Sequence, residues 1–443
     1  MLTDLHHPDM SKSEIKIGEI QDLVPFPAEL EYSCPSRGSW TIAHTPMIIP
    51  GAYMIYIGAS SCLRGVVLSA AEYEGMDRFS MVLIEEKDIL SGDMEELFIE
   101  GVTDIINKLD KRPSCVLPFT GCIHYFLATD IEYIYDELSA RFPDIDFMSC
   151  RMTPTMKENE HTPEEDMRRS MYSCIDRLPV NPRSVNMIGS NQAVSHTGDH
   201  LALLIRSGYT VRDLANCYEY SEYKQMGESC LNIYSLPVAE WSCECLEERI
   251  GQPFIYLPYT WDYSEIERDV DKLADTLGLE HPDHAAARSR AEKALADTKA
   301  VIGDTPVAID YVSSPRYISM ARLLLEHGFN VTGLYGDAIT PDEAGSLEWF
   351  RENFPDIPFR STANFRARFY GRNEAGKYGG HLLAIGPKAA YFTGTKHFVN
   401  MIENNGRYGF DGIAWLAGAM TDAFENEKDT EAVIQVKGWG CSA

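Results

Sequence analysis

The amino-acid sequence predicts an α/β protein made of three successive units, each built on a parallel sheet. Its 443 residues are 44% hydrophobic and 24% charged, so the chain can bury a large core and has the length of two or three subdomains. Short apolar runs alternate with helix-like stretches along the chain, which is the pattern of β-α-β units. We expect the three units to span residues 1–155, 156–300 and 301–443.

The first unit carries two strand-like runs, residues 54–57 (MIYI) and 115–117 (CVL), and between them the helix-like stretch 93–110. A charged segment, residues 157–169, follows with few large apolar side chains. Within it, Thr162-Pro163-Glu164-Glu165 predicts a helix start, because proline is tolerated in the first helical turn. We interpret this segment as the connection to the second unit.

The second unit begins at residues 184–189 (SVNMIG), which have strand composition, and continues through a helix near 200–207. A long polar block rich in Ala, Glu, Asp and Arg, residues 264–299, predicts helix. The third unit starts at residues 306–312 (PVAIDYV), which again have strand composition. The helical spacing of apolar residues after this strand stops at Gly328, and helices commonly end at glycine.

The net charge of -28 comes from 67 acidic and 39 basic residues. It excludes a typical nucleic-acid-binding protein, because phosphate binding needs clustered Lys and Arg. No run of about 18–20 apolar residues occurs, which argues against a membrane span. Residues 1–16 are polar and lack the apolar core of a signal peptide. We therefore expect a cytoplasmic protein that binds neither nucleic acid nor membrane.

Three of the eleven cysteines stand in comparable contexts: Cys34 in YSCPSRG, Cys62 in GASSC and Cys122 in TGCIH. Eleven cysteines in so long a chain are too sparse for a disulfide framework, so each is either a buried apolar residue or a thiolate ligand. Cys62 and Cys122 closely follow strand-like runs. Loops after parallel strands are where α/β sheets present ligands, and thiolates favour iron–sulfur clusters or zinc.

The spacing of the cysteines leaves the metal open, since no Cys-x-x-Cys pair occurs. Three thiolates also leave a tetrahedral site one ligand short. A fourth ligand, or a cluster shared with another subunit, is therefore needed. The alternative is that these cysteines are structural and that the chain is an α/β ligand-binding protein.

The order and spacing of Cys34, Cys62 and Cys122 resemble those of a known family, and five further segments do so as well. These segments are 85–92 (EEKDILSG), 128–132 (ATDIE), 184–189 (SVNMIG), 246–253 (LEERIGQP) and 408–412 (YGFDG). The family is the nitrogenase component 1 type oxidoreductases, which include the nitrogenase molybdenum–iron protein subunits, the cofactor-assembly scaffold subunits, dark protochlorophyllide reductase and the reductase of coenzyme F430 biosynthesis. The resemblance covers most of the chain.

The resemblance implies three Rossmann-like domains and an iron–sulfur cluster held by Cys34, Cys62 and Cys122 at a subunit interface. That cluster would be a [4Fe-4S] cluster or a larger P-cluster-like assembly, completed in a homodimer or by a closely related second subunit. The resemblance also implies that single electrons arrive from an ATP-hydrolysing [4Fe-4S] reductase. This reductase must be another chain, because no Gly-x-x-x-x-Gly-Lys-Ser/Thr phosphate loop occurs here.

Two further residues are candidates for cofactor binding. Arg316, which ends the run Ser-Ser-Pro-Arg between a strand and a helix start, can hold an anionic group, and its alternative role is a helix-start salt bridge. His397 lies two residues from Val399, near the position where nitrogenase has its cofactor histidine, and Leu236 stands where the cofactor cysteine would fall. Reduction of dinitrogen is therefore not expected.

The sequence thus predicts the catalytic component of a nitrogenase-like two-component reductase. Its substrate would be an unidentified small molecule, such as an organic macrocycle or another unsaturated or sulfur-containing compound. No residue is assigned a catalytic role. The second hypothesis is a non-catalytic scaffold or carrier on which a metal cluster is built, and turnover with a reductase would separate the two.

Overall fold

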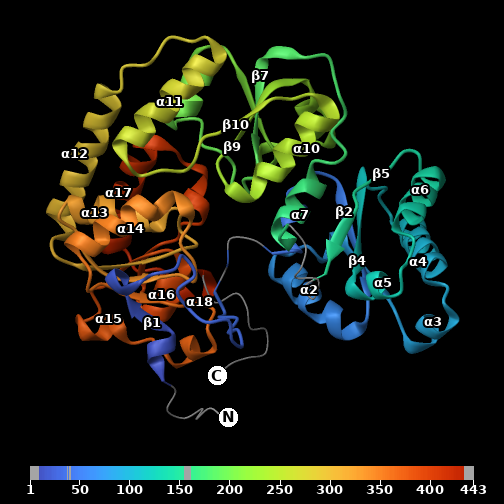
Figure 1. Ribbon diagram of the computed structural model, residues 1–443, viewed down its shortest axis with the longest axis horizontal. Helices are drawn as coiled ribbons and strands as arrows, with labels where there is room; N and C mark the ends of the chain where they lie inside the picture. The colour runs from blue at the N-terminus through green and yellow to red at the C-terminus, as the bar shows by residue number, and fades with distance from the viewer. Residues whose placement is uncertain (1–8, 37, 39–40, 154–160, 434–443) are drawn as a thin grey trace. The chain divides into compact units, whose positions relative to one another are not determined.

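The computed structural model describes residues 9–36, 38, 41–153 and 161–433 (Figure 1). Contacts within the chain divide it into two compact units. Unit 1 comprises Met1–Ser39, Ser195–Ser207 and Pro258–Ala443, and unit 2 comprises Trp40–Val194 and Gly208–Leu257. Within the described ranges, no helix is both long enough and apolar enough to cross a membrane.

Unit 2 contains an N-terminal sheet with strand order β3-β2-β4-β5, and β6 also pairs with β4. Its strands are β2 (Ala52–Gly58), β3 (Phe79–Leu83), β4 (Cys115–Gly121), β5 (Asp146–Phe147) and β6 (Cys150–Met152). The helices are α1 (His44–Met47), α2 (Ser60–Glu72), α3 (Glu86–Ser91), α4 (Met94–Lys108), α5 (Cys122–Phe126), α6 (Ile131–Arg141) and α7 (Pro163–Met171).

All strand pairs of the N-terminal sheet are parallel. Every residue of β2 and β4 is buried, because helices cover both faces of the sheet. Helices α4 and α6 pack on one face and α2 and α7 on the other, each pair with its own apolar core (Figure 1). The runs predicted as strands at 54–57 and 115–117 lie within β2 and β4, and α7 begins at Pro163 with Thr162 as its N-cap, as predicted.

The second sheet of unit 2 is also parallel, with the order β10-β9-β7-β8. Its elements are β7 (Asn181–Ile188), β8 (Thr210–Asp213), α9 (Tyr220–Gln225), β9 (Ser229–Tyr234), α10 (Glu240–Ile250) and β10 (Phe254–Tyr256). Polar side chains are buried within this sheet, where the Asn186 amide donates to Asn232 Oδ1 at 2.8 Å and to the Met226 carbonyl oxygen at 2.9 Å. These bonds offset the cost of burying the amides.

Unit 1 contains the third sheet, with the order β1-β13-β12-β11-β14-β15. Its strands are β1 (Glu14–Lys16), β11 (Pro306–Asp310), β12 (Asn330–Tyr335), β13 (Pro358–Arg360), β14 (Leu383–Ile385) and β15 (His397–Val399). Its helices are α8 (Asp199–Arg206), α11 (Tyr263–Leu277), α12 (Ala285–Ile302), α13 (Tyr317–Glu326), α14 (Ala344–Asn353), α15 (Glu374–Lys377), α16 (Pro387–Thr393), α17 (Gly409–Glu425) and α18 (Thr430–Val433).

The pairs of the third sheet are parallel except that of β1 with β13, which is antiparallel. The predicted α/β class with parallel sheets is confirmed. Strand β1 comes from the first residues of the chain, yet it pairs at the edge of the third sheet. The domain boundaries expected at residues 155 and 300 stay a prediction.

The polar helical block predicted at 264–299 is two helices, α11 and α12, instead of one. Gly278 ends α11 in the left-handed conformation, with φ of 64°, and Pro282 follows in the connection. Glycine adopts this conformation at little cost, so it stops the helix although the flanking residues are good helix formers. Gly328, where the sequence predicts the end of another helix, directly follows the C-cap of α13 and has φ of 76°.

A buried histidine, His200, lies on α8 in the interior of unit 1. The ring of Tyr408 meets it edge-on, with centroids 5.8 Å apart. Neither ring nitrogen of His200 has a hydrogen-bond partner among the described residues. Burial, together with repulsion from His284, lowers the pKa of His200 from 6.5 to about 4, so the ring is neutral in the folded protein at neutral pH.

We predict that His200 makes the protein acid-sensitive between pH 6.5 and about 4. The unfolded chain takes up a proton at the higher pKa, so stability is complete above pH 6.5 and is lost as the pH falls towards the folded-state pKa. This pKa difference corresponds to roughly 3 kcal/mol. Urea titrations across this pH range should show a smaller loss in His200→Leu than in the wild type, whereas His381→Leu, at an exposed position, should behave as the wild type. An identical pH profile for His200→Leu would contradict the prediction.

Candidate functional site

Cys62 and Cys122 emerge at the same edge of the N-terminal sheet. Cys62 lies in the first turn of α2, just after β2, and Cys122 is the first residue of α5, directly after β4. Strands β2 and β4 are hydrogen-bonded parallel neighbours, with Tyr56 opposite Phe119 near their carboxyl ends. Because the carboxyl ends of adjacent parallel strands meet at one edge, the topology brings both thiols there.

The two thiols differ in their surroundings. Cys62 is exposed, whereas Cys122 is half-buried and its Sγ lies 4.0 Å from the carbonyl oxygen of Met152. The ten cysteines in the described part of the chain form no disulfide. His124, close to Cys122, is buried with its ring edge-on to Phe98 at 5.5 Å. Burial lowers the pKa of His124, so it is a neutral packing residue.

Two thiolate donors at a sheet edge fit an iron–sulfur cluster, because soft ligands favour such clusters over hard cations. Residues 58–61 (GASS), just before Cys62, are small and let the backbone approach a bulky group. Within the residues that the structure describes, no three of His, Cys, Asp and Glu gather closely enough to hold a metal ion. A cluster at this edge would therefore take its remaining ligands from elsewhere.

Cys34 belongs to unit 1, whereas Cys62 and Cys122 belong to unit 2. Its side chain is 2% exposed, and its Sγ accepts a hydrogen bond from Lys388 Nζ at 3.1 Å. The Ser36 hydroxyl lies 3.2 Å from the same sulfur. The role of Cys34 as a third cluster ligand stays a prediction.

Arg316 is buried at the start of α13, where protein groups surround it. Its guanidinium pairs with Glu265 Oε2 at 2.6 Å and donates to the Asp342 carbonyl oxygen at 2.6 Å. Two N–H groups in the first turn of the helix, those of Ile318 and Ser319, donate to Glu343 Oε1. Burial raises the pKa of Glu343 to about 8.

Sequence reasoning missed both carboxylates around Arg316. Glu265 lies 51 residues from Arg316, and Glu343 lies 25 residues from Ile318, so no local pattern connects them. The ion pair of Arg316 with Glu265 corresponds to the helix-start salt bridge that the sequence offered as the alternative role. Binding of an anionic cofactor by Arg316 stays a prediction.

His397 is the first residue of β15 and is half-buried. Its Nδ1 lies 2.9 Å from the carbonyl oxygen of Ala423 on α17, and its Nε2 lies 4.0 Å from Glu427. These contacts orient the ring between a helix and the following loop. Cofactor binding by His397 stays a prediction.

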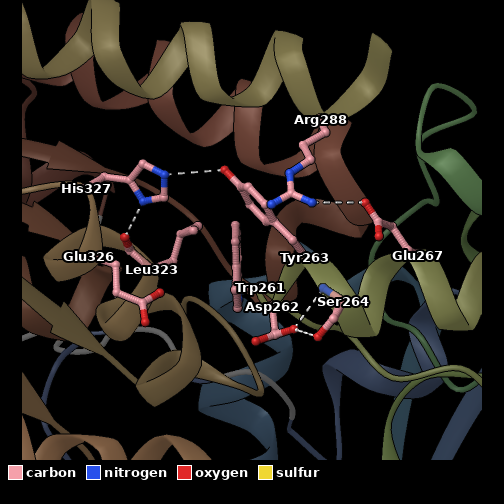
Figure 2. A pocket seen from close by; sticks show the side chains of 9 residues that line it. All are labelled: Trp261, Asp262, Tyr263, Ser264, Glu267, Arg288, Leu323, Glu326 and His327. Carbon is pink, nitrogen blue, oxygen red and sulfur yellow. Dashed lines mark hydrogen bonds and ion pairs between the residues drawn. The ribbon is translucent and has the colours of Figure 1, made fainter. Parts of the chain in front are cut away.

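A cavity of about 280 Å³, not anticipated from the sequence, opens between α11, α12 and α13 (Figure 2). Figure 2 shows Tyr263 between Arg288, whose guanidinium lies 5.0 Å from the Tyr263 ring, and His327. Arg288 pairs with Glu267 at 3.5 Å, and His327 Nδ1 donates to the Leu323 carbonyl oxygen at 2.7 Å. The polar groups of this cavity thus bond mainly to one another and tie the three helices together.

Arg316→Met is expected to lower the free energy of unfolding by about 2 kcal/mol, because it removes the buried guanidinium that bonds to the partly exposed Glu265 carboxylate and to the Asp342 carbonyl oxygen. Urea denaturation measures the change. The matched control is Lys293→Met, which breaks the exposed pair with Asp297 and should cost under about 0.5 kcal/mol. If Arg316→Met were as stable as the wild type, the structural role would be wrong and a ligand-binding role for Arg316 would gain support.

Comparisons with known proteins connect this geometry to a family. A model of the nitrogenase component 1 type oxidoreductases matches residues 40–369, which include Cys62, Cys122 and Arg316 but neither Cys34 nor His397. No curated protein matches the chain.

Solved structures share the fold. "Nitrogenase Cp1 at pH 6.5" has a TM-score of 0.63 and 14% identity, covering 90% of this chain and 94% of that chain. "Nitrogenase Cp1 at pH 5" has a TM-score of 0.56 and 12% identity, covering 94% of each chain. Identities this low show the fold alone, but the family model spans more than half of the chain. The chain therefore belongs to the nitrogenase component 1 type oxidoreductases.

Proposed function

We propose that this chain is the cluster-bearing component of a nitrogenase-like two-component reductase. Cys62 and Cys122 hold an iron–sulfur cluster at the carboxyl edge of the N-terminal sheet, and a homodimer partner or a closely related second subunit supplies further ligands. The resemblance of the sequence implies that Cys34 is another ligand, but the cluster proposed here depends on Cys62 and Cys122 alone. The observation that carries the proposal is the emergence of two thiols from neighbouring parallel strands at one edge.

Exposed apolar side chains at the same edge support the proposal that a second subunit binds there. Leu83 ends β3, Leu90 lies on α3 and Phe126 ends α5, so all three follow the carboxyl ends of the strands beside the cysteines. Leu90 is 86% and Phe126 is 70% exposed. Large apolar side chains gathered at one surface are typical of protein interfaces. Covering this edge would also shield a cluster from water and oxidants.

Family membership supports the redox role, since members generally bind iron–sulfur clusters and work with an iron-protein reductase. A thiolate-bound cluster supplies single-electron transfer. The sequence lacks the Gly-x-x-x-x-Gly-Lys-Ser/Thr motif, so an ATP-dependent iron–sulfur reductase on another chain would deliver the electrons. The substrate is an unidentified small molecule other than dinitrogen, because by the resemblance Leu236 stands where nitrogenase has its cofactor cysteine.

We predict that Cys62→Ala and Cys122→Ala each lose more than half of the iron and sulfide after anaerobic purification, because no neighbouring side chain replaces a lost thiolate. The control is Cys230→Ala on β9, a half-buried cysteine outside this edge whose Sγ lies 3.6 Å from the Pro182 carbonyl oxygen. All three variants should keep the wild-type circular dichroism spectrum.

Equal iron content in the wild type and in all three variants would contradict the proposed cluster at this edge. A second measurement separates the enzyme from a scaffold. ATP-dependent oxidation of a reduced iron–sulfur reductase by this protein supports the catalytic component, whereas release of an intact cluster without such turnover supports the scaffold or carrier.

Phe126→Asp and Leu90→Asp are expected to weaken self-association about tenfold or more, because each would bury a charge in an apolar interface. Tyr218→Asp is the matched control, since Tyr218 is 85% exposed and lies near Gly51, which precedes the amino end of β2. Sedimentation velocity over a concentration series measures the change. Unchanged association in both edge variants would rule out this edge as the interface of a homodimer.

A further inference from the structure

Cys34 and Lys388 form a buried amine–thiol pair in unit 1. Lys388 Nζ donates to Cys34 Sγ at 3.1 Å. Only 8% of Lys388 and 2% of Cys34 are exposed, although lysine is rarely buried without a specific partner. The Cys34 side chain packs among apolar residues of the third sheet and α16, including Ala308, Ala384 and Tyr391.

The backbone on both sides of the pair is fixed. At the start of α16, the Ala389 N–H donates to the fully buried Asp310 carboxylate at 2.6 Å, next to Lys388. On the other side, the Tyr32 hydroxyl lies 2.9 Å from that of Tyr391, and the Tyr32 N–H donates to the Ala363 carbonyl oxygen at 2.6 Å. The two reactive atoms are therefore held together by contacts other than their own.

A thiol in this position has no second thiol to react with. Among the described residues of unit 1, Cys34 is the only cysteine, and it forms no disulfide. Because Cys34 and Lys388 are buried, large oxidants and thiol reagents cannot reach the sulfur. Small molecules such as dioxygen do reach protein interiors. The Lys388 nitrogen and the Ser36 hydroxyl both lie within contact distance of the sulfur, and of these two groups an amine is the stronger nucleophile towards an oxidised sulfur.

We propose that Cys34 and Lys388 are a redox-responsive modification site, which dioxygen converts into a covalent Nζ–O–Sγ bridge. The pair carries three exchangeable hydrogens, whichever group holds the shared proton. One oxygen atom forms the bridge and the other leaves as water with two of these hydrogens. Dioxygen accepts four electrons, two from the nitrogen and two from the sulfur, so atoms, charge and electrons balance.

The bridge ties the N-terminal segment to α16, because the two residues lie 354 positions apart in the sequence. A cross-link that closes so long a loop restricts the unfolded chain and stabilises the fold. This site does not depend on the cluster proposed at Cys62 and Cys122. It gives Cys34 a role other than the ligand role that the resemblance implies.

The test is mass spectrometry of the full-length protein. The protein is purified without oxygen, and the preparation is divided into one sample kept without oxygen and one exposed to air. Exposure to air should add one oxygen atom and remove two hydrogen atoms in most molecules, and protease digestion should yield the Cys34 peptide joined to the Lys388 peptide. Dithiothreitol should reverse both changes. Lys388→Arg keeps a cation beside Cys34 but has no primary amine, so it should form no bridge, whereas Lys396→Arg, at a largely exposed lysine, should behave as the wild type.

Three outcomes would overturn the proposal. The first is air oxidation that leaves the Cys34 peptide unlinked, whether or not oxygen is added to the sulfur. The second is an equal yield of linked peptide in Lys388→Arg. The third is a loss of iron in Cys34→Ala equal to that in Cys62→Ala, which would assign the thiol to the cluster. Loss of iron confined to Cys62→Ala and Cys122→Ala, with the bridge present in air, supports both proposals separately.

Discussion

The parallel pairing of β2 with β4 is the constraint on which the candidate cluster site depends. Both strands are buried on both faces, so a shift of one residue would exchange the side chains that face the two cores. The register from Ala52 opposite Cys115 to Tyr56 opposite Phe119 therefore fixes where each strand ends. The loops and helix starts that follow bring Cys62 and Cys122 to one edge, although several elements separate them in the sequence.

In and beside the third sheet, buried carboxylates accept the hydrogen bonds of backbone N–H groups at two helix starts. Asp310 accepts hydrogen bonds from the Val312 N–H and, at the start of α16, from the Ala389 N–H, while Glu343 caps the start of α13. Burial raises the pKa of Asp310 to about 6 and that of Glu343 to about 8, yet both groups are bonded because an unpaired buried carboxyl group is costly. Helix starts that could receive anions are thus held by the protein's own acids.

The cysteines show how surroundings set the chemistry of one residue type. Cys62 is exposed at a sheet edge, where a thiolate can meet metal and a partner chain. Cys34 is enclosed, and the Lys388 amine and the Ser36 hydroxyl are the polar side chains bonded to its sulfur. Access and neighbouring charge, more than sequence spacing, therefore separate a candidate metal ligand from a candidate redox site.

The sequence by itself determined the α/β class, the family resemblance and the strands at 54–57, 115–117 and 184–189, because apolar runs and turn residues act over a few neighbouring positions. It also indicated which two cysteines follow strands. The tertiary structure alone decided that β1 pairs with β13, that Arg316 meets Glu265 and that Lys388 meets Cys34. Each of these contacts joins residues far apart in the chain, so it depends on the packing of whole elements, which no local pattern encodes.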